Sequence, residues 1–404
     1  MFQTLIEIAQ QLLETQFSLP CEINAFEQLS EPERRNVILR LHIDAENKTL
    51  PETVILKQSL PEEDNQDDKD TYTRFAQDWA GLEFLSSINH TEHFTPNFYG
   101  GNAAHRFVLL EDLGAVHISL VDALSRPNKA EAIGALTRFI HAIAGMHAAS
   151  FGHLNVYESI LKRLHPQHKT WQEHVQWRKA YLLPLLESTC QILGVKASQE
   201  LLQEADYVIE TMFTPGPFTV LTHGDICPDN VFDHKSSKDM QLIDFEYASP
   251  RHALLDGTYL RMSMPTCWCA KAFPVPVIKT METIYKQKLA TTIPAAKDKI
   301  EYQKAYVLAC GFWILQQTLH FIENTLTQDR VGPSGPTPAD SFWDPEKNWV
   351  RPRVLSRLQA FVDVATPTGH LPQLTQMAKS MLGILAARWP ETKPLEFYPA
   401  FQGK

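Results

Sequence analysis

Apolar side chains recur at helical spacing over residues 1–14 and again, in longer stretches, over the second half of the chain. The first of these patterns predicts an amphipathic helix within residues 1–20. Glu7 interrupts the apolar positions and no basic segment precedes them, so we do not expect a signal peptide. Three short segments rich in β-branched and apolar residues predict strands, at 23–29, 36–43 and 53–58.

Most of the remaining chain has the spacing of helices. These are expected at 71–87, 131–150, 159–190, 197–212, 302–324, 354–364 and 371–388. Pro166 and Pro184 are expected to break the helical stretch 159–190. A run of acidic residues at 62–70 predicts a solvated, mobile loop. Two further pairs of strands are predicted, one ending at 107–114 and one forming a hairpin around the polar turn 233–239.

Composition narrows the class of protein. Of the 404 residues, 44% are hydrophobic and 21% are charged, as in ordinary soluble globular proteins, and the length leaves room for two lobes. The net charge of −10 argues against a protein that binds nucleic acid, which needs a basic face. No apolar run approaches the length of a membrane span, so we expect no membrane insertion. Nothing in the composition indicates an oligomeric state.

The cysteines and histidines give little sign of a metal centre. Six cysteines are scattered along the chain, and only Cys267 and Cys269 lie close together, in a C-x-C spacing that is poor for zinc. A reduced, cytoplasmic compartment is the default expectation. His141 and His147 are six residues apart rather than the four that would place them on one helix face, so a core role for His147 is favoured.

Two polar motifs carry the chemistry that the sequence predicts. Segment 223–230 reads HGDICPDN and segment 243–246 reads IDFE, and each lies beside a short apolar stretch that predicts a strand. This spacing of two carboxylates and an amide is typical of a phosphotransferase. One carboxylate takes the proton of a substrate hydroxyl, while the second carboxylate and the carboxamide hold magnesium on the phosphates of ATP.

These motifs resemble those of the aminoglycoside phosphotransferase / choline kinase family of small-molecule kinases, which share a two-lobed, protein-kinase-like fold. In that family H-G-D replaces the H-R-D of protein kinases, and D-F-E replaces D-F-G. The resemblance extends from about residue 22 to about 260. It implies an α+β fold, with a small, mostly antiparallel N-terminal lobe at 21–113 and a helical C-terminal lobe at 115–404.

The resemblance also implies a reaction and a role for each motif residue. The expected activity is transfer of the γ-phosphate of ATP, with Mg²⁺, to a hydroxyl of a small molecule. Asp225 is expected to be the base or to orient the hydroxyl, and Asn230 and Asp244 are expected to hold Mg²⁺. His223 and Asp256 are expected to support the catalytic loop without contacting substrate.

The N-terminal lobe is expected to bind the nucleotide. Lys57 ends a V-I-L-K strand and resembles the lysine that grips the phosphates. Asp78 is expected to orient Lys57, with Glu83 as second choice, because aspartate is one methylene shorter than the glutamate usual in the family. Glu111 and Leu113 lie in a segment, 110–114, that resembles the hinge against which adenine binds. The alternatives, a solvated lysine, a surface acid and an ordinary strand exit, stay open.

One segment departs from the family pattern. The loop that covers the phosphates in kinases is usually rich in glycine, whereas residues 30–36 here contain none. Arg34 and Arg35 could compensate by charge, although such a run is more often a solvated hairpin tip. This departure favours the alternative function, a catalytically weak, kinase-like nucleotide-binding or scaffold protein.

The acceptor is the least defined part of the prediction. Glu246 is expected to face either the substrate or the metal, and the loop after residue 331 carries Asp340, Trp343 and Asp344. Such a loop could enclose an amine-bearing acceptor, such as an amino alcohol or an aminoglycoside, by charge and cation–π contact. A surface loop fixed by aromatic packing is the alternative. The aromatic stretch 171–177 is interpreted as helix packing.

Overall fold

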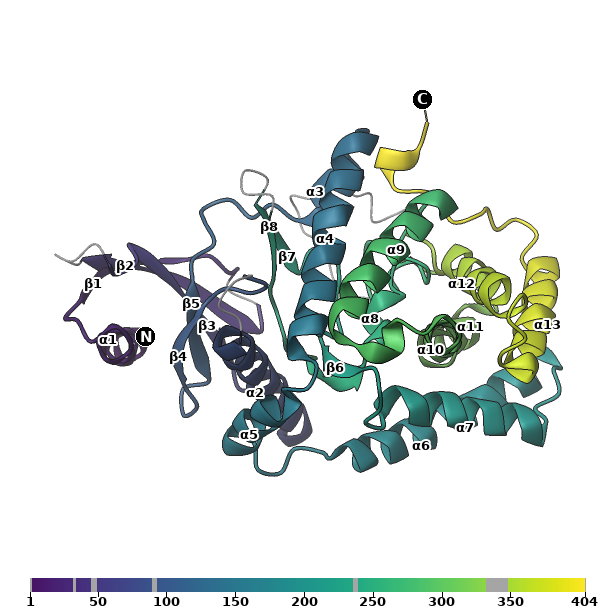
Figure 1. Ribbon diagram of the computed structural model, residues 1–404, viewed down its shortest axis with the longest axis horizontal. Helices are drawn as coiled ribbons and strands as arrows, with labels where there is room; N and C mark the ends of the chain where they lie inside the picture. The colour runs from purple at the N-terminus through teal and green to yellow at the C-terminus, as the bar shows by residue number, and fades with distance from the viewer. Residues whose placement is uncertain are drawn as a thin grey trace.

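The computed structural model describes residues 2–31, 34–44, 49–88, 93–234, 239–331 and 348–403, and it has the expected two lobes. A curved sheet forms the small lobe and a group of helices forms the large one, with the helix α2 between them (Figure 1). The protein therefore has an α+β, two-lobed fold of the protein-kinase-like kind.

The small lobe is an antiparallel, five-stranded sheet with the order β1-β2-β3-β5-β4. Its strands are β1 (Glu22–Gln28), β2 (Asn36–Asp44), β3 (Thr53–Ser59), β4 (Phe98–Asn102) and β5 (Phe107–Glu111). Along β2, and along β3 as far as Leu56, buried residues alternate with half-buried ones, because successive side chains of a strand point to opposite faces. The three strands predicted at the start of the chain are thus confirmed.

Helices cover this sheet and connect it to the large lobe. Helix α1 (Gln3–Phe17) buries Leu5, Ala9 and Leu13, four residues apart, in the core of the small lobe. Helix α2 (Asn65–Ile88) instead contributes its apolar residues to the core of the large lobe. The acidic run 62–70 was wrongly predicted to be a loop, since α2 begins within it. Asp68 lies in the first turn, where its negative charge interacts favourably with the positive end of the helix dipole. It also pairs with Arg106 at 2.5 Å.

The large lobe is mainly helical. Its helices are α3 (Leu120–Ser125), α4 (Lys129–Ser150), α5 (Leu154–Leu164), α6 (Trp171–Leu193), α7 (Gln199–Phe213), α8 (Leu254–Gly257), α9 (Val275–Thr292), α10 (Lys299–Trp313), α11 (Leu319–Thr325), α12 (Val350–Ala365) and α13 (Pro372–Arg388), with short turns η1 (Pro294–Ala296), η2 (Ile314–Thr318) and η4 (Pro399–Phe401). Four short strands pair as β6 (Thr219–Thr222) with β9 (Ser249–His252) and β7 (Val231–His234) with β8 (Asp239–Leu242). The predicted hairpin is therefore confirmed.

Two proline predictions have different outcomes. Pro166 lies between α5 and α6, as predicted, whereas Pro184 lies inside α6. The N-terminus of α6 is fixed by a capping box between Thr170 and Glu173, and Leu182 and Leu186 are buried on either side of the proline. Tertiary packing therefore offsets the lost backbone hydrogen bond.

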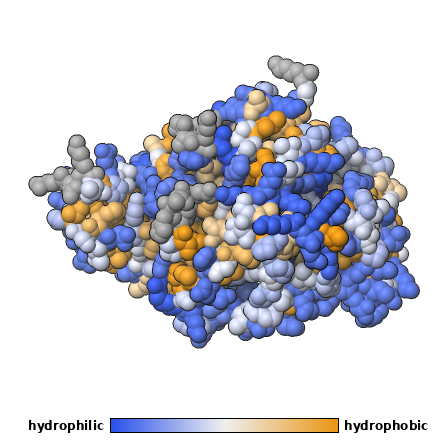
Figure 2. Space-filling model, in the orientation of Figure 1, coloured by the Kyte–Doolittle hydropathy of each residue, from blue (hydrophilic) through white to orange (hydrophobic). Residues whose placement is uncertain are grey.

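Residues Lys299–Thr325 form one continuous helical rod, 27 residues long, through α10, η2 and α11. By length and composition this rod could cross a membrane, which corrects the expectation that no apolar run approaches that length. However, 78% of its most apolar window is buried inside the protein. Its apolar character is thus explained by the core of the large lobe. On the face shown in Figure 2, hydrophilic residues predominate and hydrophobic ones form small, separate groups.

Gly257 offers a test of the packing beneath the catalytic loop. A Cβ at this position would lie 2.6 Å from the ring of the buried Tyr285. We expect Gly257→Ala to destabilise the fold by about 1–3 kcal/mol, because overpacking forces side chains out of their rotamers. The matched control is Gly383→Ala, at an exposed position of α13, where a Cβ would meet no neighbouring atom within 4 Å and alanine should stabilise by about 0.5–1 kcal/mol. Urea unfolding of both variants measures the difference, and equal stabilities would contradict the packing.

Candidate active site

The two sequence motifs lie side by side at the end of the β7–β8 hairpin. Strand β6 leads into the loop 223–230, and β7 follows it directly. The Ile243 N–H donates to the Asn230 carbonyl at 3.0 Å, which continues the β7–β8 pairing by one residue. The HGDICPDN and IDFE segments are therefore neighbours in space because the hairpin connects them.

Backbone conformation explains the residue type at two positions of the motifs. Gly224 has φ +84°, and a Cβ there would lie 2.5 Å from the Tyr247 carbonyl oxygen and would clash with the Arg251 guanidinium. Only glycine fits this position. Asp244 has φ +68°, a left-handed conformation that is uncommon for a residue with a side chain. Such conformations concentrate at functional sites.

Asp256 fixes the backbone of the catalytic loop from below. Its Oδ2 accepts the His223 N–H at 2.7 Å, and its Oδ1 accepts the Gly224 N–H at 3.3 Å. The His147 Nε2 lies 3.2 Å from the same carboxylate. The fully buried His223 ring contacts the Ile243 carbonyl through Nε2 at 2.9 Å, so it links the two motifs. The structure thus brings His223 and Asp256 together behind the loop.

Lys57 joins the small lobe to the second motif. Its Nζ lies 2.8 Å from Asp78 Oδ2 and 2.6 Å from Asp244 Oδ1, although 187 residues separate Lys57 from Asp244. Burial alone would lower the pKa of Lys57, but the two carboxylates outweigh it and raise the pKa above its usual value. The amine is therefore a permanent cation at this position.

Of the two acids proposed to orient Lys57, the structure places only Asp78 against it. The second Asp78 oxygen accepts the Phe245 N–H at 2.7 Å, so this carboxylate joins α2, β3 and the metal loop. Glu83 points elsewhere, since it accepts from Trp79 Nε1 and from Arg163, each at 2.6 Å. Although aspartate is shorter than glutamate, the Asp78 carboxylate lies close enough to contact both Lys57 and the backbone of the metal loop.

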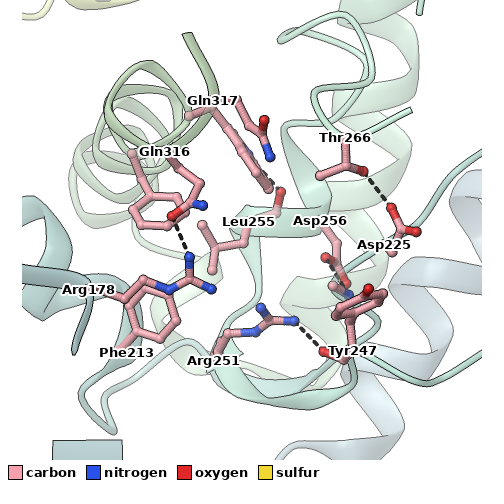
Figure 3. Close-up of a pocket in the computed structure, with 13 residues that line it drawn as sticks. Arg178, Phe213, Asp225, Tyr247, Arg251, Leu255, Asp256, Thr266, Gln316 and Gln317 are labelled. Carbon is pink, nitrogen blue, oxygen red and sulfur yellow. Dashed lines mark hydrogen bonds between the residues drawn. The ribbon is translucent and has the colours of Figure 1, made fainter. Parts of the chain in front are cut away.

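Asp225 lines a cavity of about 340 Å³ in the large lobe (Figure 3). Its Oδ1 accepts the Thr266 hydroxyl at 2.6 Å. Burial raises the pKa of Asp225 to about 7, and the nearby Asp229 acts in the same direction. A carboxylate with a pKa near neutral is suited to accept a proton at physiological pH.

Glu246 is held by the small lobe. Arg35 donates to both its oxygens, at 2.7 and 2.6 Å, from the segment that replaces the glycine-rich loop. Arg34 pairs instead with Glu31 at 3.2 Å. Burial, followed by the charge of Asp244, raises the pKa of Glu246. One of the two arginines in the glycine-free segment therefore places a cation next to the metal loop.

The hinge residues lie at the end of β5 and just beyond it. The Glu111 carboxylate accepts the Asn97 backbone N–H at 3.0 Å and its side-chain amide at 2.9 Å, so the side chain anchors the strand. The next residue, Asp112, pairs with Arg40 at 2.5 Å. Leu113 lies just beyond, half-buried, in the connection to α3. This leaves backbone groups as the means of contact with a nucleotide base.

The residues proposed to hold a divalent metal fit a magnesium ion by their chemistry. The Asn230 side-chain N–H donates to the Asp225 carbonyl at 2.9 Å, which leaves its amide oxygen as the available ligand. That oxygen and the Asp244 carboxylate are hard donors, and Mg²⁺ typically takes one or two such ligands together with substrate phosphates. Over the described part of the chain, no group of three or more His, Cys, Asp or Glu residues could hold a metal by itself. Asp340, Trp343 and Asp344 lie outside the described residues, so their roles stay predictions.

The structure joins Cys227, in the catalytic loop, to Cys267 by a disulfide. The sequence analysis did not predict this pair, because it considered spacing along the chain and the two residues are 40 positions apart. Their contact depends on the segment after α8, which also carries Thr266 to Asp225. The expectation of a reduced, cytoplasmic compartment stays a prediction.

Most residues that line the cavity were missed from the sequence, four polar ones close to Asp225 or on the far wall among them. These four are Thr266, Tyr247, Arg178 and Arg251. Thr266 and Arg178 come from distant segments without a motif. Arg251 and Tyr247 lie just after IDFE, so their position beside the motif was the only available signal.

The sequence of this chain matches a known protein family. Residues 45–273, more than half of the chain, match the model of the phosphotransferase enzyme family. No curated protein matches the chain significantly. Among solved structures, the chain is similar to the ethanolamine kinase of Plasmodium vivax, with a TM-score of 0.42 and 13% identity over 86% of this chain and 83% of that one.

Two more solved structures cover almost the whole chain. The GDP complex of aminoglycoside 2'-phosphotransferase-IIIa has a TM-score of 0.44 and 12% identity, over 90% of this chain and 99% of that one. Amicoumacin kinase hAmiN, in complex with AMP-PNP, Ca²⁺ and Ami, has a TM-score of 0.44 and 11% identity, over 91% and 96%.

The family match, together with the two motifs, defines the class: this chain belongs to the phosphotransferase enzyme family. It is an enzyme, a phosphotransferase.

Asp78 and Glu83 allow a direct test of the lysine contact. We expect Asp78→Ala to weaken binding of Mg–ATP by about tenfold or more, because it removes a charged hydrogen bond from Lys57 and leaves the Phe245 N–H without its acceptor. Glu83→Ala, on the same helix, should leave the affinity unchanged. Calorimetric titration measures both, with thermal unfolding to verify the fold. Equal affinities in the two variants would exclude a role for Asp78 in nucleotide binding.

Proposed function

We propose that this protein transfers the γ-phosphoryl group of ATP, in the presence of Mg²⁺, to a hydroxyl of a small molecule. The observation that carries this proposal is the position of Asp225. Its carboxylate lines a cavity of small-molecule size, while its loop adjoins Asp244, the partner of Lys57. One short loop thus borders both an acceptor cavity and a cluster suited to phosphates.

In this mechanism the residues position and neutralise the reacting groups. Asp225 accepts the proton of the acceptor hydroxyl, whose oxygen forms the new bond to phosphorus as the bond to ADP breaks. Lys57 pairs with the phosphates, and Asp78 holds Lys57 against the loop. Asn230 and Asp244 would hold Mg²⁺, which when bound neutralises phosphate charge. Much of the rate then comes from positioning, as in other phosphoryl transfers.

The small lobe supplies the nucleotide side of this proposal. The hinge at 110–114 offers backbone groups to the base, and Arg35 offers a cation in place of a glycine-rich loop. The Lys57–Asp244 contact would have to open for the lysine to engage phosphate, and Asp78 keeps the amine nearby as it does so. The alternative, a nucleotide-binding protein with weak or no catalysis, predicts binding without turnover.

A screen of ATP consumption tests the proposal. Purified protein with Mg–ATP is incubated with pools of amino alcohols, aminoglycosides, macrolides, sugars and organic acids. Turnover is expected with one pool, and Asp225→Asn is expected to reduce it by ~10²–10⁴-fold while Mg–ATP still binds. Asp363→Asn, an exposed acid on α12, is the matched control and should not change the rate.

The remaining outcomes separate the two functions. Binding of Mg–ATP without turnover in any pool would favour the non-catalytic alternative. Turnover that survives Asp225→Asn would refute the role of this carboxylate, and absence of Mg–ATP binding would refute the ATP-dependent function.

A further inference from the structure

Two arginines line the same cavity as the Asp225 carboxylate. Arg178 comes from α6 and Arg251 from β9, and in Figure 3 both guanidinium groups lie on the side of the cavity opposite Thr266. The other acid of the lining, Asp256, is already committed to the backbone of the catalytic loop and to His147. The far side of the cavity is therefore cationic.

Neither arginine forms a direct ion pair with a carboxylate among the residues that the structure describes. Arg178 donates Nη1 to Gln316 Oε1 at 2.6 Å, and its Nε is buried without a hydrogen-bond partner. Arg251 donates to the Thr222 hydroxyl at 2.8 Å and to the Tyr247 carbonyl at 2.9 Å. All these acceptors are neutral. The nearby charge of Asp256 acts on Arg251 without a direct contact, whereas no carboxylate acts on Arg178 in this way.

Aromatic packing holds Arg178 in this position. Its guanidinium lies 4.6 Å from the ring centre of Trp177 and 5.4 Å from that of Phe213. Burial, followed by the charge of Arg251, lowers the pKa of Arg178 to about 10. Burial likewise lowers the pKa of Arg251. Two desolvated cations in one cavity carry an energetic penalty that an anion bound between them would relieve.

The wall beside Arg178 has an unusual backbone. Gln316 and Gln317 belong to η2, a π-helical turn within the continuous rod 299–325. Such turns are rare and occur frequently at functional sites, because they redirect side chains that a regular helix would place elsewhere. Here the turn presents two amides to the cavity, one of which orients Arg178.

We propose that this cavity binds an anionic group of the phosphate acceptor, a carboxylate or a phosphate, between Arg178 and Arg251, with the acceptor hydroxyl at Asp225. The assignment of this ligand as the acceptor rests on the proposed function. The planar fork of a guanidinium matches both kinds of anion with paired hydrogen bonds. The cavity of about 340 Å³ suits a small, hydroxyl-bearing organic acid.

The same arginines do not belong to the nucleotide side. Lys57, Asp244 and Glu246 are absent from the lining of this cavity, whereas residues of α6, α7 and η2 form its far wall. A phosphate of the nucleotide held by Lys57 would thus lie outside the lining of this cavity. The two clusters therefore separate the donor from the acceptor.

Binding is tested first, independently of turnover. With the nucleotide site filled by Mg–AMP-PNP, thermal unfolding is followed against D-glycerate, D-gluconate and glycerol 3-phosphate. Glycerol and glucitol at equal ionic strength are the neutral counterparts. At least one acid is expected to raise Tm where its counterpart does not, and comparison of the carboxylates with the phosphate identifies the anion.

Variants then locate the effect. Arg178→Gln is expected to weaken binding of that acid by ~10–100-fold, because it removes a charged hydrogen bond, and Arg178→Lys should recover part of the affinity. Arg388→Gln, at the exposed end of α13, is the matched control and should bind as the wild type does. Binding of Mg–ATP should be unchanged in all three variants.

The outcomes distinguish this inference from the proposed function. The inference would be overturned if none of the acids raised Tm above its neutral counterpart, or if Arg178→Gln left the response to the acid unchanged. Turnover of a neutral or purely cationic acceptor at a rate that Arg178→Gln does not change would also overturn it, although the kinase function would then stand. An acid that binds through Arg178 while no ATP is consumed would instead sustain the anion site and refute the kinase function.

Discussion

A single buried carboxylate, that of Asp256, determines the form of the catalytic loop. It is almost inaccessible to solvent, yet it accepts two backbone N–H groups of the loop and lies against His147. Burial tends to raise the pKa of Asp256, but the contact with His147 and the other partners lowers it overall, so the group stays ionised. An unpartnered charge at this depth would be very unfavourable. The loop must therefore keep the path in which His223 and Gly224 present their N–H groups, and this path carries Asp225 to the cavity.

A second carboxylate, that of Asp78, extends this order to the small lobe. One oxygen contacts Lys57 on β3, and the other accepts the backbone N–H that follows Asp244. The Asp78 carboxylate therefore connects the sheet of the small lobe directly to the metal loop. Because the acid is short and buried, it tolerates little movement of α2 relative to the loop. The relative position of the lobes thus depends on the same Asp78 contacts that hold Lys57 where it would bind phosphate.

Local sequence patterns were sufficient to predict the parts of the site that residues close together in the sequence determine. Motif spacing placed Asn230 and Asp244 at the ends of one hairpin, and strand composition placed Lys57 on β3. Prediction failed where distant segments meet. Arg178 has no motif around it, and its role depends on a π-helical turn more than 130 residues later in the chain. Pro184 was misjudged for a related reason, since burial on both sides of it overrides the preference of proline.

The far wall of the cavity, with Arg178 and Arg251, differs in sign from the net charge of the whole chain. A net charge of −10 says little about the acceptor, because net charge acts through water and salt, where it is screened within about 8–10 Å. Within a desolvated cavity the nearest groups determine the potential, and on the far wall these are two guanidinium groups whose hydrogen-bond acceptors are all neutral. Their attraction for an anion acts over a few ångströms, in a low dielectric where it is far stronger. The local constellation is therefore the better guide to the acceptor, and the overall composition bears chiefly on solubility.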